Sequence, residues 1–90
     1  MEKTIITVVG KDRVGIIAGV CTYLAENDIN ILNITQTIVD GFFNMMMIVD
    51  TSEASKKFGD IQKELGELGN EMGLMIKAQK EEIFNMMHRI

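Results

Sequence analysis

A short run of glycines and charged residues at positions 10–16 holds the groups best suited to bind a small ligand. The run reads Gly-Lys-Asp-Arg-Val-Gly-Ile, follows an apolar strand pattern and opens a helix pattern. The first amide groups of a helix have no acceptor inside the helix and carry partial positive charge, so a strand that turns directly into a helix forms an anion-binding mouth. The run therefore predicts a site for a small acidic metabolite, with no catalytic machinery beside it.

The residue types in this region suit an amino acid as the ligand. Gly10 and Gly15 let the backbone approach a guest closely, and the amides at the start of the helix can donate to a carboxylate. Asp12 can pair with an ammonium group, and Asn30, which follows the helix, offers both a donor and an acceptor. The candidate ligand-binding residues are Gly10, Lys11, Asp12, Arg13, Gly15, Ile16, Asn30 and Ile31.

A purely structural interpretation of the same residues stands beside this one. In it, Asp12 caps the helix, Gly15 allows close packing of helix on strand, and Asn30 closes a turn. Lys11 and Arg13 are then solvated surface charges rather than ligand contacts. A ligand titration separates the two interpretations.

Short turns join the elements that must position this run. The first strand is β-branched throughout and is expected to be buried on both faces. Asp40-Gly41 between two strand patterns favours a type I′ hairpin, and Thr51-Ser52 offers a cap for the second helix. The sequence predicts strands over 4–9, 30–40, 42–50 and 74–79, and helices over 14–27, 53–72 and 81–90.

Apolar spacing predicts which face of each helix is buried. In the first helix, the residues at helical spacing are Val14, Ile17, Ala18, Cys21, Leu24 and Ala25. In the second helix, they are Phe58, Ile61, Leu65, Leu68 and Met72.

The order β-α-β-β-α-β predicts an α+β fold, the ferredoxin-like sandwich. Its antiparallel four-stranded sheet has both helices on one face and the first and third strands in the centre. Residues 1–80 form this domain, and 81–90 form a tail helix. The run Met45–Met47 places methionine on both sheet faces, so the open face is partly apolar and needs the tail helix, a second subunit or both as cover.

Composition narrows the classes of partner. A net charge of −4 argues against direct nucleic-acid binding, and no apolar run approaches the roughly 18 residues that span a membrane. Met1 leads straight into a strand pattern without a signal peptide, and one cysteine forms no internal disulfide, so we expect a cytoplasmic protein. Cys21 and His88 lie too far apart in sequence for a metal site, and we expect no cofactor.

Three features together resemble the ACT domain family over residues 3–80. They are the motif Asp-Arg-Val-Gly-Ile-Ile at 12–17, Asn30-Ile31 at the head of the second strand, and Phe42-Phe43 opening the third. The likeness is strongest to small stand-alone ACT proteins and to one half of the glycine-cleavage regulators. Val14 stands where the family usually has proline, which leaves the loop less rigid.

The resemblance implies a non-catalytic regulatory module that binds a small molecule, most often an amino acid. It also implies a homodimer or higher homo-oligomer, a ligand held between subunits beside the first loop, and a regulated protein as partner. The main alternative is a ligand-free oligomerisation subunit. An acylphosphatase-like enzyme using Arg13 and Asn44 lacks a supporting motif, and an RNA-reading sheet lacks aromatic residues on its first strand.

Overall fold

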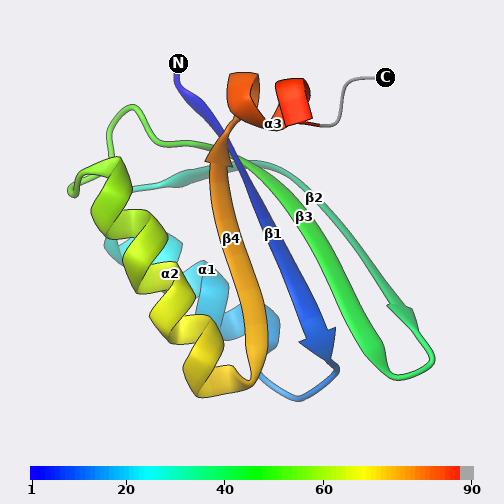
Figure 1. Cartoon of the computed structure of the whole chain (residues 1–90). Coiled ribbons are helices and arrows are strands. Elements are labelled where there is room, and N and C mark those ends of the chain that lie inside the picture. The colour runs from blue at the N-terminus through cyan, green and yellow to red at the C-terminus, as the bar shows by residue number, and fades with distance from the viewer. Residues whose placement is uncertain (88–90) are drawn as a thin grey trace.

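Strands and helices follow one another in the predicted order. The computed structural model describes residues 1–87, so the predicted end of the tail helix, with His88, lies outside the described residues. Figure 1 shows the arrangement. The elements are β1 (Lys3–Lys11), α1 (Ile16–Glu26), β2 (Asn30–Val39), β3 (Phe42–Asp50), α2 (Phe58–Met72), β4 (Leu74–Lys80) and α3 (Glu81–Met87).

The sheet is antiparallel and has the order β2-β3-β1-β4, which confirms the ferredoxin-like topology with β1 and β3 in the centre. Val8 of β1, for example, lies opposite Met45 of β3 and Ile76 of β4. In Figure 1, α1 lies behind the sheet and α2 runs alongside β4, while α3 lies at the top of the view, beside the start of β1 and the end of β4.

The core lies between the sheet and the two long helices. Met45 and Met47 are buried there, whereas Met46 is 41% exposed on the opposite face, so methionine does occupy both faces. Burial of β1 on both faces holds only for its first half, because Val9 is exposed on the face away from α1 and α2. The main core residues are Ile6, Val8, Val20, Leu24, Met45, Met47, Val49, Ile61 and Leu65.

The turn between β2 and β3 has the predicted geometry. Asp40 has φ 51° and Gly41 has φ 79°. Two successive positive φ values are what a type I′ turn requires, and this turn matches the twist of the strands it joins. The hairpin tip therefore has a defined shape next to the end of β1.

The buried stripe predicted for the first helix is largely wrong. α1 begins at Ile16 rather than Val14, and its buried residues are Ile16, Val20 and Leu24. Val14 is 94% exposed in the loop before the helix. The segment is apolar almost all the way round, so several stripes satisfy the helical spacing and sequence alone does not choose among them. In α2, which is amphipathic, the predicted Ile61 and Leu65 are buried.

The predicted cap of the second helix is also wrong. α2 begins at Phe58 after an N-cap at Lys57 that makes no side-chain hydrogen bond. The Thr51 hydroxyl is instead buried 3.0 Å from the Thr4 hydroxyl, and the Ser52 hydroxyl donates to Asp50 Oδ1 at 2.7 Å. Both hydroxyls therefore bond to residues at the end of the sheet rather than to the helix. Five residues, 53–57, follow Ser52 before α2 begins.

The two edge strands of the sheet, β2 and β4, differ in how far other elements cover them. At the β4 edge, Gln62 Nε2 of α2 donates to the carbonyl oxygen of Ala78 at 2.8 Å, and a Cβ on Gly69 would lie 2.7 Å from the carbonyl oxygen of Leu74. At the β2 edge, every residue except Ile31 is exposed. Because an uncovered edge is a template for another strand, β2 is the edge able to pair with a second chain.

Candidate functional site

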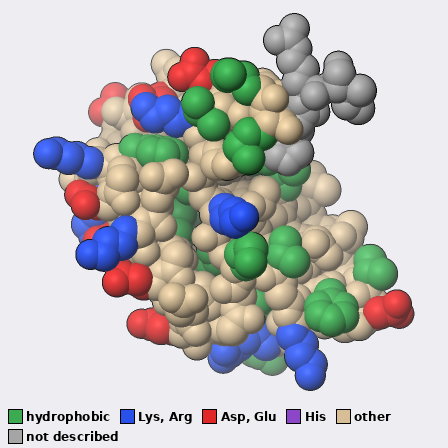
Figure 2. Space-filling view, in the orientation of Figure 1, with side chains coloured by type: hydrophobic (Ala, Val, Ile, Leu, Met, Phe, Trp, Pro, Cys, Tyr) green, Lys and Arg blue, Asp and Glu red, His purple; other side chains and the backbone are tan. Residues whose placement is uncertain are grey.

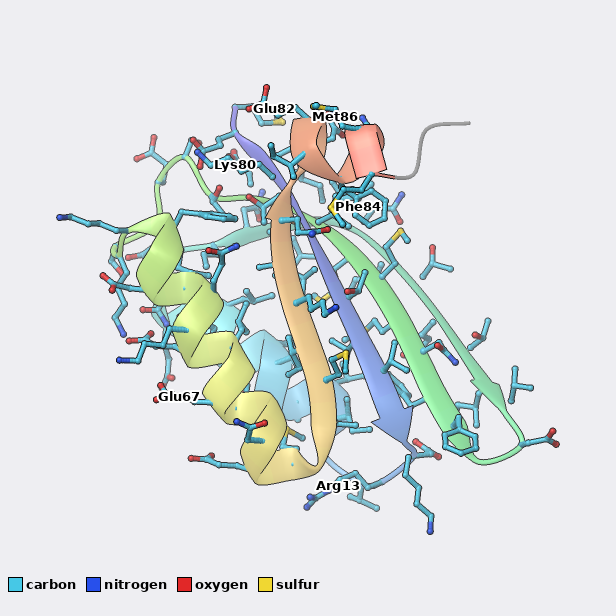
Figure 3. All side chains as sticks on the ribbon, in the orientation of Figure 1. Arg13, Glu67, Lys80, Glu82, Phe84 and Met86 are labelled. Atoms are coloured by element: carbon cyan, nitrogen blue, oxygen red, sulfur yellow. The ribbon has the colours of Figure 1, made fainter. Side chains whose placement is uncertain are left out.

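The predicted loop lies where β1 ends, beside the hairpin tip and the end of α2. The Asp12 amide donates to the Gly41 carbonyl oxygen at 2.8 Å. Arg13 Nη1 donates to the Met72 carbonyl oxygen at 3.3 Å, and Figure 3 shows Arg13 at this lower end of the molecule. A cation suits the negative end of a helix dipole, so Arg13 holds the loop against α2. The hairpin contact was not anticipated, although Asp40-Gly41 was recognised as a turn.

Gly15 shapes the mouth of the loop through its backbone conformation. It is the N-cap of α1 with φ 91° and ψ 3°, and no side chain caps the helix. Asp12 is therefore not the cap that the structural interpretation expected. A Cβ on Gly15 would meet nothing within 4 Å, so close packing is not the reason for glycine here. A left-handed backbone is the reason, and the first amides of α1 have neither an acceptor inside the helix nor a side-chain cap.

Gly10 plays the packing role instead. A Cβ there would lie 2.5 Å from Leu74 Cδ2 and 3.2 Å from the carbonyl oxygen of Gly73. The end of β1 thus touches the start of β4 closely. This contact fixes where the loop leaves the sheet, so Gly10 has a packing role, and its contact with a ligand stays a prediction.

Asn30 and Ile31 lie at the opposite end of the sheet from the loop. Asn30 pairs with Asp50, as does Lys3 at the start of β1, whereas Lys11 at the end of β1 pairs with Phe42. Eight residue steps along a strand separate the two ends by roughly 25 Å. A single chain therefore does not bring Asn30 to the loop.

The loop is open to solvent in the single chain. Residues 11–15 are all exposed, and Ile16 is buried in the core, so only its amide is available to a guest. Hollows of about 480, 340 and 380 Å³ lie elsewhere, respectively at the start of β1, on the open sheet face, and between α2 and β4. Because small-molecule sites enclose most of their ligand, this loop needs a wall from another source.

A polar cluster away from the loop fixes α1 against α2. Tyr23 Oη donates to Glu64 Oε1 at 2.7 Å, and Lys56 Nζ lies 2.8 Å from the same oxygen. Hydrogen bonds from Lys56 and then Tyr23 lower the pKa of Glu64. Burial, followed by the bond to Glu64, raises the pKa of Tyr23 well above its ordinary value. The cluster therefore favours a neutral phenol and a charged carboxylate at neutral pH.

The positions of the described residues give little support to the enzymatic alternative or to a metal site. Arg13 bonds to the end of α2, while Asn44 lies on the open face of β3 opposite Val9, so the pair named for an acylphosphatase-like enzyme does not converge. Within residues 1–87, no three histidine, cysteine or acidic residues gather around one point. Helices long and apolar enough to cross a membrane do not occur in this part of the chain.

Comparison with known proteins gives one consistent result. A family model described as an ACT domain matches residues 2–79. A protein named UPF0237 from Bifidobacterium longum is 59% identical to this chain over 90 residues. The match covers 100% of both chains. An ACT domain protein from Streptococcus pneumoniae has a solved structure with 41% identity and a TM-score of 0.81, and the match covers 92% of this chain and 93% of that one.

A more distant structure shares the fold. It is described as a putative glycine cleavage system transcriptional repressor, is 22% identical and has a TM-score of 0.74. The match covers 88% of this chain and 45% of that one.

Proposed function

The chain belongs to the ACT domain family, a family of regulatory ligand-binding modules, and from that premise we propose that it is an amino-acid sensor acting as a cytoplasmic homodimer. The bound or empty state of the sensor is passed to a regulated protein. It performs no catalysis itself. The observation that carries the proposal is the separation of the loop from Asn30 within one chain.

Pairing two chains through β2 shortens that separation to three strand spacings, roughly 14 Å, because the strand order from the loop then runs β1, β3, β2 and β2 of the partner subunit. If two β2 strands run antiparallel about a two-fold axis, the start of one lies beside the end of the other. Asn30 of the partner subunit then reaches the end of the sheet where the loop and the hairpin tip lie. The same pairing supplies a wall for the loop, and each dimer has two equivalent sites.

The side chains of β2 support this pairing. Ile34 and Ile38 lie opposite Met47 and Phe43, so they face the helix side of the sheet. They are nevertheless exposed, Ile38 by 56%, because α1 does not cover this edge. A second chain along β2 would bury both, which favours the dimer over the monomer.

The proposed site combines the loop of one chain with Asn30 of the partner subunit, and its groups match an α-amino acid. The uncapped amides at the start of α1 suit the carboxylate. The Asp12 carboxylate, which has no hydrogen-bond partner among residues 1–87, suits the ammonium group. The amide of Asn30 from the partner subunit can bond to either end, and the side chain of the ligand selects among amino acids by fit.

A thermal-shift screen of the full-length chain against the twenty amino acids tests the proposal. We expect one or a few to stabilise the protein, because a ligand at 100 times its Kd adds about 2.7 kcal/mol to stability. Calorimetry then measures the affinity, and the deaminated analogue of the hit should lose it. No stabilisation by any of the twenty contradicts the proposal.

A ligand-free oligomerisation subunit is the second candidate. Apolar side chains exposed on the open sheet face favour it, because such faces are usually interfaces. This function predicts a stable oligomer that no amino acid stabilises further.

A further inference from the structure

An exposed isoleucine of β2 lies on the helix side of the sheet, toward the end that carries the loop. Ile38 is opposite the buried Phe43, so its side chain projects to the side where α1 packs, yet it stays exposed. Ile34 also faces this side, but it lies near the middle of β2, where the two-fold axis of the proposed dimer passes. The partner strand therefore meets Ile34 near the axis, whereas Ile38 faces the space beside the loop.

A second exposed isoleucine lies in the first turn of α1. The buried residues of α1 face the sheet, and Tyr23 marks the side that faces α2 through its bond to Glu64. At 100° per residue, Ile17 falls on the side away from α2, toward the β2 edge, and it is exposed. Val14, in the loop before the helix, is exposed as well. We call Val14, Ile17 and Ile38 the apolar trio.

The elements that flank the apolar trio carry almost no charge. No charged residue occurs in β2 from Asn30 to Val39, and the only one in α1 is Glu26 at its end. Figure 2 shows charged side chains gathered over α2 at the left of the view, whereas the β2 edge at the right carries charge only at the hairpin tip. A ligand side chain directed between α1 and β2 therefore enters uncharged surroundings.

The charges of the loop point to other places. Lys11 pairs with Phe42, which alternates with a buried neighbour, so Lys11 lies on the open face of the sheet. Arg13 donates to the end of α2, and the Asp12 carboxylate is the proposed partner of the ligand's ammonium group. An acidic ligand side chain beside the trio would lose hydration without gaining a cation, which costs free energy.

The partner subunit adds little that would favour a basic ligand. Its acids nearest to Asn30 in the chain are Glu26 and Asp28, and both are exposed to solvent. Water and salt screen exposed charges, so their attraction for a basic side chain is weak. Apolar contact with the trio therefore decides which ligand binds best.

We propose that the site selects an amino acid with an apolar side chain, which lies between Ile17 of α1 and Ile38 of β2. This inference rests on the proposed sensor function and names the class of its ligand. Burial of each further methylene group of the ligand should lower its Kd roughly fourfold, until the space is full.

Calorimetry on the full-length chain with alanine, 2-aminobutyrate and norvaline tests the inference, because each differs from the last by one methylene. Serine has nearly the shape of 2-aminobutyrate, and aspartate and lysine supply the two charges. We expect the Kd to fall roughly fourfold at each step of the apolar series. Serine, aspartate and lysine should all bind more weakly than norvaline.

Two neighbouring positions of β2 give a matched pair of variants. Ile38→Thr keeps a β-branched residue in the strand and should remove most of the dependence of Kd on chain length. Val39→Thr should leave that dependence unchanged, because Val39 is 59% exposed, as against 56% for Ile38, but lies on the open face opposite Phe42. If light scattering shows that Ile38→Thr alters the mass, Ile17→Thr in α1 replaces it, with the same expected result.

The outcomes separate this inference from the sensor function on which it rests. Tightest binding by serine, aspartate or lysine, or equal Kd values along the apolar series, overturns the apolar class and leaves an amino-acid sensor. Binding of no amino acid overturns both proposals. A full dependence on chain length in Ile38→Thr and Ile17→Thr, or its equal loss in Val39→Thr, overturns the place assigned to the ligand's side chain.

Discussion

Gly15 is the residue on which the shape of the loop depends. Its φ of 91° is a conformation that other residues adopt at a cost of about 1–2 kcal/mol. Because space around it is free, a methyl group there strains the backbone without a clash. Binding and stability can therefore be separated at this position.

Gly15→Ala should lower the melting temperature by roughly 4–16 °C, at about 4–8 °C per kcal/mol for a domain of this size. It should also abolish stabilisation by the amino acid found in the screen. The matched control is Gly73→Ala, which has the same kind of positive φ and free space at the end of α2. Equal loss of ligand stabilisation in both variants would mean that Gly15 acts only through the fold.

Glu64 gives the fold a defined response to acid. Its pKa is lower in the folded chain, so the stability it contributes is complete above its unfolded pKa and disappears as pH falls through the folded value. Glu64→Gln should lower the urea midpoint at pH 7, and its difference from wild type should shrink on going to pH 3. Glu67→Gln on the same helix is the control, and an equal effect from it would contradict the assignment to the Tyr23–Glu64–Lys56 cluster.

Two glycines in α2 look alike in the sequence but differ in their surroundings. A Cβ on Gly66 would meet nothing within 4 Å, whereas one on Gly69 would lie 2.7 Å from the backbone oxygen of Leu74. Gly66→Ala should stabilise the protein by about 0.5–1 kcal/mol, because alanine favours the helix. Gly69→Ala should destabilise it by about 1–3 kcal/mol, because α2 must move off β4. Chemical denaturation measures both, and equal signs would contradict this account of the β4 edge.

Sequence patterns predicted the elements that have strong local signals. The Asp40-Gly41 turn, the strand order and the buried Ile61 and Leu65 of α2 are confirmed. The buried face of α1 was missed because nearly every residue of that helix is apolar. The cap at Thr51-Ser52 was missed because both hydroxyls bond to residues that are distant or preceding in the chain.

The candidate site was predictable only in part. Spacing identified the loop, and the positive φ of Gly15 fits that prediction. The contacts of Arg13 with α2 and of Asp12 with the hairpin are long-range, so local patterns do not contain them. The placement of Asn30 at the far end of the sheet follows from the topology, and its role in the site stays a proposal.

At the scale of the whole molecule, the uneven cover of the sheet directs assembly. α2 protects the β4 edge, while among residues 1–87 nothing covers the β2 edge or the part of the open sheet face beside the hairpin tip. The β2 edge is proposed to complete the ligand site. A sensor whose site spans two chains couples ligand binding to assembly by linkage, because each event favours the other.

Subunit complementation tests the shared site most directly. A Gly15→Ala chain and an Asn30→Ala chain, each unable to bind the amino acid, are unfolded together and refolded as a mixture. If the site joins the loop of one chain to Asn30 of the other, each mixed dimer regains one intact site, and calorimetry should find about a quarter of the wild-type binding capacity. If the site lies within one chain, the mixture should bind no ligand, and the central claim is wrong.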